Sequence, residues 1–169
     1  MALDLLDPKA GERLLDVGIG GGGLLAKLLR TRPRLLAGVD VSSAAIERAR
    51  RLFARRAEIV HASAESLPFP DGSFDGATSV SVLHFWADLD PPLREIARML
   101  RPGGRLVVVF EPPEALRRWP GHVHGFHLWE VEQVIEAAER AGLRLEERRE
   151  GAGFKPDFFV GLRFRKGAG

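Results

Sequence analysis

The sequence predicts an α/β fold: a doubly wound, mostly parallel sheet that ends in an antiparallel C-terminal hairpin. Segments typical of strands and helices alternate along residues 13–110, and glycine, proline or serine stands at the changes. Beyond a helical segment at 128–141, the strand segments 143–149 and 158–165 follow one another without a helix between them. Alternating units give parallel strands, whereas two strands joined without a helix form an antiparallel pair.

Apolar runs and the residues that bound them predict the elements in order. Ser42 can accept free backbone N–H groups where the second helix begins, Pro91 suits the first turn of the third, and Gly142 ends the last. Residues 67–72 form a turn-rich connection, and 111–127 is expected to be irregular. Strands are expected at 13–17, 35–39, 58–61, 74–82, 106–110, 143–149 and 158–165. Helices are expected at 22–30, 42–55, 91–100 and 128–141.

Length and composition limit the classes of function. With 169 residues, the chain fits one domain, residues 1–166, and is too short for a nucleotide domain plus a separate catalytic domain, which weighs against a dehydrogenase. Residues 167–169 are expected to be a disordered tail. The absence of cysteine excludes disulfides, thiolate metal sites and a cysteine nucleophile. Because the chain shows neither an apolar run of about 18 residues nor a leader near Met1, we expect a cytoplasmic protein without a membrane partner.

The charge pattern disfavours a nucleic-acid partner. The formal net charge is only +2, and nucleic-acid binding proteins usually gather their basic residues on one face. The densest basic cluster, between Arg48 and Arg56, spreads around a predicted helix instead. We interpret it as a solvated helix surface.

A glycine cluster directly after the first predicted strand indicates a nucleotide-type site. Asp16 stands two residues ahead of Gly18, and Gly20 and Gly22 follow. Glycines at the end of a strand allow a sharp turn and let a ligand lie against the backbone. The same cluster also satisfies the dinucleotide pattern GxGxxG, which is weak on its own, so a dinucleotide and other nucleosides both remain open at this point.

Asp40, at the end of the second predicted strand, lies about 20 residues beyond the glycine cluster, a spacing typical of ribose-binding acids. A carboxylate there can accept hydrogen bonds from both ribose hydroxyls, and it repels a 2′-phosphate. Capping of the following helix is its alternative role. In an open α/β sheet the ligand lies at the carboxyl ends of the strands, near the topological switch point, where these residues should meet.

Four segments, in this order, resemble class I S-adenosylmethionine-dependent methyltransferases, especially the branch that includes the ubiquinone and menaquinone biosynthesis type. The resemblance implies a seven-stranded, Rossmann-like methyltransferase sheet. It also places the methionine part of the cofactor over Asp16 and Gly18, the ribose on Asp40 and the adenine beside Ser63 and Ala64. The segments are the glycine cluster with Asp16, Asp40, residues 62–75 and residues 100–106.

The chemistry of S-adenosylmethionine agrees with this set of residues. The molecule carries a sulfonium and an ammonium but no phosphate, so a carboxylate near the glycine cluster favours it over a dinucleotide. The family often has an acid where this chain has Ser63, whose hydroxyl reaches less far, and Glu65 is a candidate substitute. The predicted cofactor-binding residues are Asp16, Gly18, Gly20, Gly22, Asp40, Val41, Ser63, Ala64, Glu65 and Ser79.

The residues after the fourth predicted strand bear on the methyl acceptor. They lack the Asn/Asp-Pro-Pro-Tyr set that holds an exocyclic amine, which disfavours DNA adenine methylation. His84 can orient or deprotonate an acceptor, or it can be a structural histidine bonded to the backbone. Glu111 can act as a base, or it can be a solvated carboxylate. We name both as catalytic candidates.

Four aromatic residues are predicted to contact the substrate: Phe85, Trp86, Trp119 and His124. The spacing of His122, His124 and His127 also permits a metal site, but no carboxylate stands at typical ligand spacing. A loop beside the substrate is therefore favoured, and no metal is predicted.

The sequence thus predicts methyl transfer from S-adenosylmethionine to a small-molecule acceptor, with S-adenosylhomocysteine as the product. Three alternatives stay open: a regulatory module that binds the cofactor without catalysis, an RNA or protein methyltransferase, and, most remotely, an NAD-binding oxidoreductase. Because only about a dozen residues precede the first strand, residues 111–127 are expected to supply most substrate recognition, with a second copy of the chain as a candidate partner.

Overall fold

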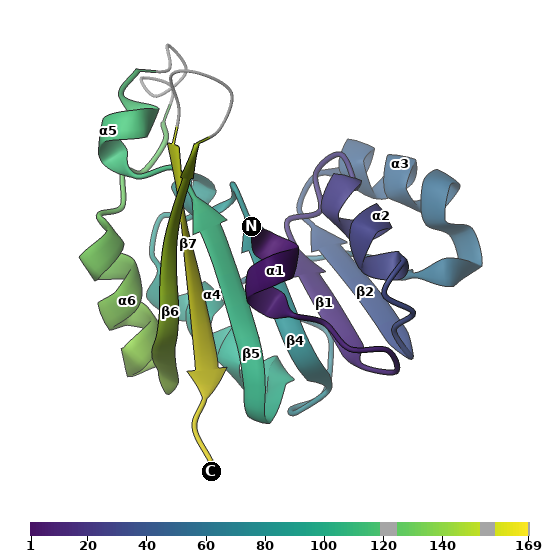
Figure 1. Ribbon diagram of the computed structural model, residues 1–169. Helices are drawn as coiled ribbons and strands as arrows, with labels where there is room; N and C mark the ends of the chain where they lie inside the picture. The colour runs from purple at the N-terminus through teal and green to yellow at the C-terminus, as the bar shows by residue number, and fades with distance from the viewer. Residues whose placement is uncertain (119–124, 153–157, 169) are drawn as a thin grey trace.

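A computed structural model describes residues 1–118, 125–152 and 158–168. It confirms the predicted fold class, because one seven-stranded sheet has the strand order β3-β2-β1-β4-β5-β7-β6 (Figure 1). Strands β1 to β5 are parallel, and β7 runs antiparallel to both β5 and β6. The strands are β1 Arg13–Val17, β2 Leu35–Asp40, β3 Glu58–His61, β4 Phe74–Val80, β5 Leu100–Phe110, β6 Leu143–Ala152 and β7 Phe158–Lys166.

The helices pack on both faces of the sheet. On one face lie α1, α2 and α3, and on the other lie α4 and α6. Adjacent strand residues point to opposite faces, so Leu14 packs toward α2 and α3 while Leu15 packs toward α4 and α6. The helices are α1 Ala2–Leu6, α2 Gly23–Leu29, α3 Ser43–Phe53, α4 Asp90–Met99, α5 Pro113–Leu116 and α6 Val131–Arg140, with short 3₁₀ turns η1 Ala54–Arg56 and η2 Leu83–Phe85.

Three elements differ from those that the sequence predicts. Helix α1 precedes the first strand, and α5 lies within the segment expected to be irregular. Strand β5 begins at Leu100 rather than at Leu106, because Leu100 pairs with Phe74 and the register then shifts before Gly76. Gly103, with φ of 74°, lets the backbone take this irregular path. Residues 101–105, which lie between the expected helix and the expected strand, are therefore part of the sheet.

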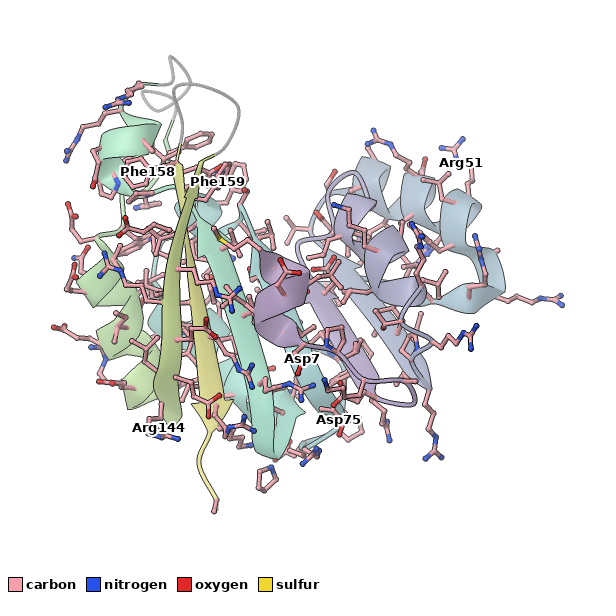
Figure 2. The ribbon with its side chains drawn as sticks, in the orientation of Figure 1. Asp7, Arg51, Asp75, Arg144, Phe158 and Phe159 are labelled. Atoms are coloured by element: carbon pink, nitrogen blue, oxygen red, sulfur yellow. The ribbon has the colours of Figure 1, made fainter. Side chains whose placement is uncertain are left out.

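Charged side chains form hydrogen bonds and ion pairs at the edge of the sheet where the parallel strands begin. Asp75 accepts a hydrogen bond from the backbone N–H of Arg13 at 2.7 Å and pairs with the Arg101 guanidinium (Figure 2). Arg105 and Glu12 form a largely buried pair at 2.6 Å. These contacts join β1, β4 and β5 at one end and leave the carboxyl ends of the strands for a ligand.

The chain reverses its direction of winding between β1 and β4, which are neighbours in the sheet. Ligands of open α/β sheets bind at such a switch point. Within the described ranges, no helix has the length and hydropathy that crossing a membrane requires. The predicted tail, residues 167–169, lies partly outside these ranges, and Gly167 donates its backbone N–H to the Gly142 carbonyl at 3.2 Å.

Candidate functional site

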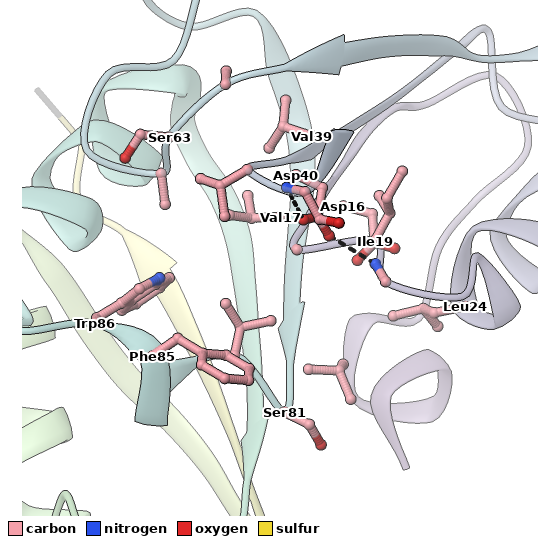
Figure 3. A pocket seen from close by; sticks show the side chains of 18 of the residues that line it. Asp16, Val17, Ile19, Leu24, Val39, Asp40, Ser63, Ser81, Phe85 and Trp86 are labelled. Atoms are coloured by element: carbon pink, nitrogen blue, oxygen red, sulfur yellow. Dashed lines mark hydrogen bonds between the residues drawn. The ribbon is translucent and has the colours of Figure 1, made fainter. Parts of the chain in front are cut away.

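A cavity of about 660 Å³ opens at the carboxyl ends of β1, β2, β3 and β4, at the switch point (Figure 3). This volume lies within the range of roughly 300–1,000 Å³ that is typical of small-molecule sites. The described residues that line it are Asp16, Val17, Gly18, Ile19, Gly20, Gly21, Leu24, Val39, Asp40, Val41, Ser42, Ala62, Ser63, Ala64, Glu65, Val80, Ser81, Val82, Phe85 and Trp86.

The loop between β1 and α2 requires glycine for two different reasons. Gly18 has φ of 80°, and a Cβ atom there would lie 2.3 Å from Cγ2 of Val82. Gly20 has φ of 47°, but a Cβ atom there would have no neighbour within 4 Å. Gly18 is therefore needed for the fold itself, whereas the space beside Gly20 belongs to the cavity.

This difference predicts separate outcomes for two alanine variants. Gly18→Ala is expected to lower the free energy of unfolding by about 3 kcal/mol, since a left-handed backbone and a clash with Val82 combine. Gly20→Ala is expected to lower it by only about 1 kcal/mol and to weaken S-adenosylmethionine binding more than about tenfold, because the methyl group enters the cavity. Urea unfolding and calorimetric titration measure the two effects.

Gly23→Ala is the matched control, because its Cβ atom would also meet nothing within 4 Å and Gly23 does not line the cavity. It should bind the cofactor like the wild type. Wild-type affinity in Gly20→Ala would contradict the assignment of this loop to the ligand.

Asp16 is a buried acid at the floor of the cavity. Its side chain is 2% exposed, and its Oδ1 accepts a hydrogen bond from the Thr78 hydroxyl at 2.7 Å. Burial raises the pKa of the Asp16 carboxyl to about 7; the hydrogen bond from Thr78 opposes this rise, and the charge of Asp40 adds to it. A cation beside Asp16 would favour the ionised form.

Asp40 ends β2 with its carboxylate held at two points. Oδ2 accepts the backbone N–H of Gly20 at 2.9 Å, and Oδ1 accepts that of Ser42 at 2.8 Å. These bonds fix the carboxylate where β2 meets the glycine loop, as Figure 3 shows. Each carboxylate oxygen has further lone pairs, so the group can also accept hydrogen bonds from a ligand in the cavity.

The loop after β3 forms the next wall. Ser63 Oγ accepts the backbone N–H of Glu65 at 3.2 Å, and the Ala62 backbone N–H donates to the Asp40 carbonyl at 3.1 Å. Ser63, Ala64 and Glu65 all line the cavity, and their contact with an adenine stays a prediction.

Arg98 of α4 anchors the continuation of this loop. Its guanidinium donates to the carbonyls of Leu67 and Phe69, each at 3.1 Å, and to the carboxylates of Glu95 and Asp71. The hydrogen bonds to these acids raise the pKa of Arg98 and, at Glu95, lower the pKa of the carboxyl. Three of these contacts, to Leu67, Phe69 and Asp71, hold the loop, and the fourth joins Arg98 to Glu95 of the same helix.

Removal of this anchor is expected to be costly. Arg98→Ala should lower the free energy of unfolding by about 2 kcal/mol, because the carbonyls of Leu67 and Phe69 lose their donor and Glu95 keeps only the Leu67 backbone N–H. Arg98→Lys should rescue little, since an ammonium cannot reproduce the forked geometry. Urea unfolding measures both variants, and full rescue by lysine would contradict this explanation.

Several predicted site residues do not line the cavity. Ser79 is fully buried inside the sheet, and Gly22 forms the N-cap of α2. Glu111 follows β5, and its Oε1 accepts a hydrogen bond from Ser81. The predicted roles of these residues stay predictions.

His84 is 8% exposed. The centroid of its ring lies 4.2 Å from that of the Phe85 ring and 4.4 Å from that of the Phe126 ring. Burial lowers the pKa of His84, which favours the neutral imidazole. The ring is not among the described residues that line the cavity, so its catalytic role stays a prediction. Phe85 and Trp86 do line it.

The predicted substrate residues Trp119 and His124 lie outside the described residues, as does His122. His127 is described, and its ring stacks on Trp129 with centroids 5.8 Å apart. Ten residues that line the cavity were not predicted as site residues: Val17, Ile19, Gly21, Leu24, Val39, Ser42, Ala62, Val80, Ser81 and Val82. Ser81 and Val82 stand at the end of the strand expected at 74–82, and Ser42 was named only at the start of a helix.

Comparison with known proteins agrees with this site. The methyltransferase domain family matches residues 15–108. An O-methyltransferase, resE, from Aspergillus sclerotiorum is 34% identical over 154 residues, which are 84% of this chain and 58% of that protein. A demethylmenaquinone methyltransferase from Thermus thermophilus is 40% identical over 116 residues, which are 66% of this chain and 53% of that protein.

Among solved structures, the N-methyltransferase NodS from Bradyrhizobium japonicum in complex with S-adenosylhomocysteine has a TM-score of 0.82 and 26% identity, covering 98% of this chain and 83% of that chain. The chain spans only slightly more than half the length of the two relatives above. The matched domain, the sheet order and the glycine loop with its two acids lead to one conclusion: the chain belongs to the methyltransferase domain family, in its class I S-adenosylmethionine-dependent group.

Proposed function

We propose that this chain binds S-adenosylmethionine and transfers its methyl group to a small molecule, releasing S-adenosylhomocysteine. The observation that carries the proposal is the pair of fixed acids, Asp16 and Asp40, in one cavity whose described lining residues include no basic side chain. Such a site suits a ligand with positive charge and neutral hydroxyls, and it opposes a pyrophosphate.

The residues present fit this cofactor. Asp40 would hold the ribose hydroxyls, the backbone around Gly18 and Gly20 would lie along the methionine part, and Ser63 with Ala64 would contact the adenine. Asp16, with its raised pKa, is the group that gains most from a nearby cation. The bound cofactor supplies a methyl group on a sulfonium, which is already a strong electrophile. The protein then contributes mainly by positioning the acceptor behind that methyl group.

The names of the relatives support an acceptor of small size. The proteins from Aspergillus and Thermus are named as an O-methyltransferase and a demethylmenaquinone methyltransferase. We further propose that residues 1–166 form the one domain that carries this activity. A cytoplasmic location and a homodimer also stay proposals.

A regulatory module that binds the cofactor without catalysis is the second candidate. It is favoured by one observation: His84 and Glu111, the catalytic candidates, are absent from the described lining of the cavity. A screen with methyl-labelled S-adenosylmethionine, in which metabolite, RNA and protein fractions are offered separately as acceptors, distinguishes the two. Transfer of label to a small molecule supports the enzyme, whereas cofactor binding without transfer to any fraction supports the module. Label in RNA or protein fractions would contradict the small-molecule acceptor.

A further inference from the structure

Ser81 is held in an unusual way at the wall of the cavity. It has φ of 55°, in the left-handed region that serine seldom adopts. Its backbone N–H donates to the Val109 carbonyl at 2.8 Å, and its hydroxyl donates to Glu111 Oε1 at 3.2 Å. Strained backbone of this kind persists only where surrounding contacts hold it, and it is concentrated at functional sites.

The hydrogen bond to Glu111 fixes the direction in which the Ser81 hydroxyl donates its proton. Because the hydroxyl proton is directed at the carboxylate, the lone pairs of Ser81 Oγ remain for a donor in the cavity that Ser81 lines. When a hydroxyl donates to a carboxylate, the negative charge also strengthens the hydrogen bond that the same hydroxyl oxygen accepts. Ser81 is thus prepared to accept a hydrogen bond from a ligand.

Two aromatic residues, Phe85 and Trp86, line the same cavity as Ser81, and Figure 3 draws all three side chains. The Phe85 side chain is 64% exposed although its edge contacts the ring of Phe126, with centroids 5.2 Å apart. An exposed aromatic face at a cavity wall suits a flat, apolar ligand.

The charges of the cavity restrict the ligand further. Its described lining residues include three acids, Asp16, Asp40 and Glu65, and no Lys, Arg or His. A carboxylate or phosphate on the acceptor would lose water and find no cationic side chain among the described lining residues, so its cationic partner would be the sulfonium of the cofactor, which S-adenosylhomocysteine lacks. An uncharged hydroxyl would lose far less, and Ser81 can replace one of its water contacts.

We propose that Ser81, oriented by Glu111, is the polar contact that positions the methyl acceptor, and that the acceptor is an uncharged hydroxyl compound with an apolar ring. This inference rests on the proposed methyl transfer. During transfer the carbon–sulfur bond breaks with its electron pair left on sulfur, and a lone pair of the acceptor oxygen forms the new carbon–oxygen bond. The acceptor proton moves to Ser81 Oγ as the Ser81 proton moves to Glu111. Glu111 acts only through Ser81 and is a positioning residue.

The test measures binding of three probes to the protein saturated with S-adenosylhomocysteine, by calorimetry. The probes share one ring system: 2-naphthol carries the hydroxyl, naphthalene carries no polar group, and 2-naphthoate carries a carboxylate. The wild type is expected to bind 2-naphthol about fivefold to tenfold more tightly than naphthalene, the effect of one net hydrogen bond. It should bind 2-naphthoate at least about tenfold more weakly than 2-naphthol.

Ser81→Ala is the decisive variant, because alanine keeps the size and backbone preference of serine and lacks only the hydroxyl. It should bind naphthalene like the wild type but lose the preference for 2-naphthol, a change that a purely structural role of Ser81 would not produce. Glu111→Gln should reduce the preference about twofold to threefold, because an amide can also donate to Ser81 and turn its proton toward the cavity.

Three results would overturn the inference: no binding of 2-naphthol, equal or tighter binding of 2-naphthoate, or an unchanged preference in Ser81→Ala. Its failure differs from a failure of the proposed function, which would appear first as the absence of S-adenosylhomocysteine binding to the wild type.

Discussion

An Asp16→Asn variant is expected to be more stable than the wild type at pH 8 and to lose most of its affinity for S-adenosylmethionine. Burial raises the pKa of Asp16 from 3.8 to about 7 in the folded chain. The difference of about 3 units corresponds to an upper limit of about 4 kcal/mol against folding once the group is ionised. Asparagine keeps an oxygen for the Thr78 hydroxyl and has no charge to bury, so we expect a gain of about 2 kcal/mol in urea unfolding.

The pH dependence of this gain has a definite sign. Below pH 3.8 the Asp16 carboxyl is protonated in both the folded and the unfolded chain, and the stability that the protonated group gives the wild type is fully present. As pH rises from there to about 7, the unfolded chain ionises first and the wild type loses this stability, completely above the folded-state pKa. The stability difference between variant and wild type should therefore grow from pH 5 to pH 8.

The affinity of the wild type for the cofactor should rise with pH, whereas its stability falls. A cation in the cavity favours ionised Asp16, so the wild type should bind S-adenosylmethionine more tightly at pH 8 than at pH 6. The variant should bind it roughly 10- to 100-fold more weakly at pH 8 and should lose this pH dependence, because a charge-assisted interaction is removed. An unstable variant, or one that binds as tightly as the wild type, would contradict the role of Asp16.

Substitution of Asp40 is expected to have the largest effect on binding. Asp40→Ala removes the acceptor for Gly20 N–H and Ser42 N–H as well as the proposed ribose contacts. Two charge-assisted hydrogen bonds to a ligand are worth about 3 kcal/mol or more, so affinity should fall more than about 100-fold. Asp40→Asn should lose less, because one oxygen remains as an acceptor. Calorimetric titration with S-adenosylmethionine and with adenosine measures both.

Asp7→Asn supplies the matched control. It removes one exposed carboxylate that does not line the cavity, and asparagine tolerates the φ of 47° at this position. Asp7 lies toward the lower end of the sheet in Figure 2, away from the glycine loop. The control should bind like the wild type. Equal losses in Asp7→Asn and Asp40→Ala would show that loss of net charge, rather than a ribose contact, weakens binding.

The sequence predicted the fold class and several residues that line the cavity because both depend on local signals. Alternating apolar runs determine the order of strands and helices, and parallel strands bring their carboxyl ends together. Gly18 directly follows β1, Asp40 ends β2, and Asp16 is the residue before the last of β1, so their positions in the cavity followed from the order of the elements. Ser63 and Glu65 lie in the cavity for the same reason.

The placement of His84 and Ser81 depends on tertiary contacts that no local pattern encodes. The burial of His84 results from packing against Phe126, which is 42 residues farther along the chain. The orientation of Ser81 results from a positive φ and from a bond to Glu111. The early start of β5 depends on pairing between Leu100 and Phe74, which lies on a different strand.

The most direct test of the central claim, that this cavity binds a cationic nucleoside, is a calorimetric comparison of S-adenosylmethionine and NADH with the wild type at pH 8. We expect one S-adenosylmethionine to bind per chain, with no measurable binding of NADH and with the affinity lost in Asp40→Ala. Binding of NADH in preference to S-adenosylmethionine, or unchanged S-adenosylmethionine binding in Asp40→Ala, would contradict the claim.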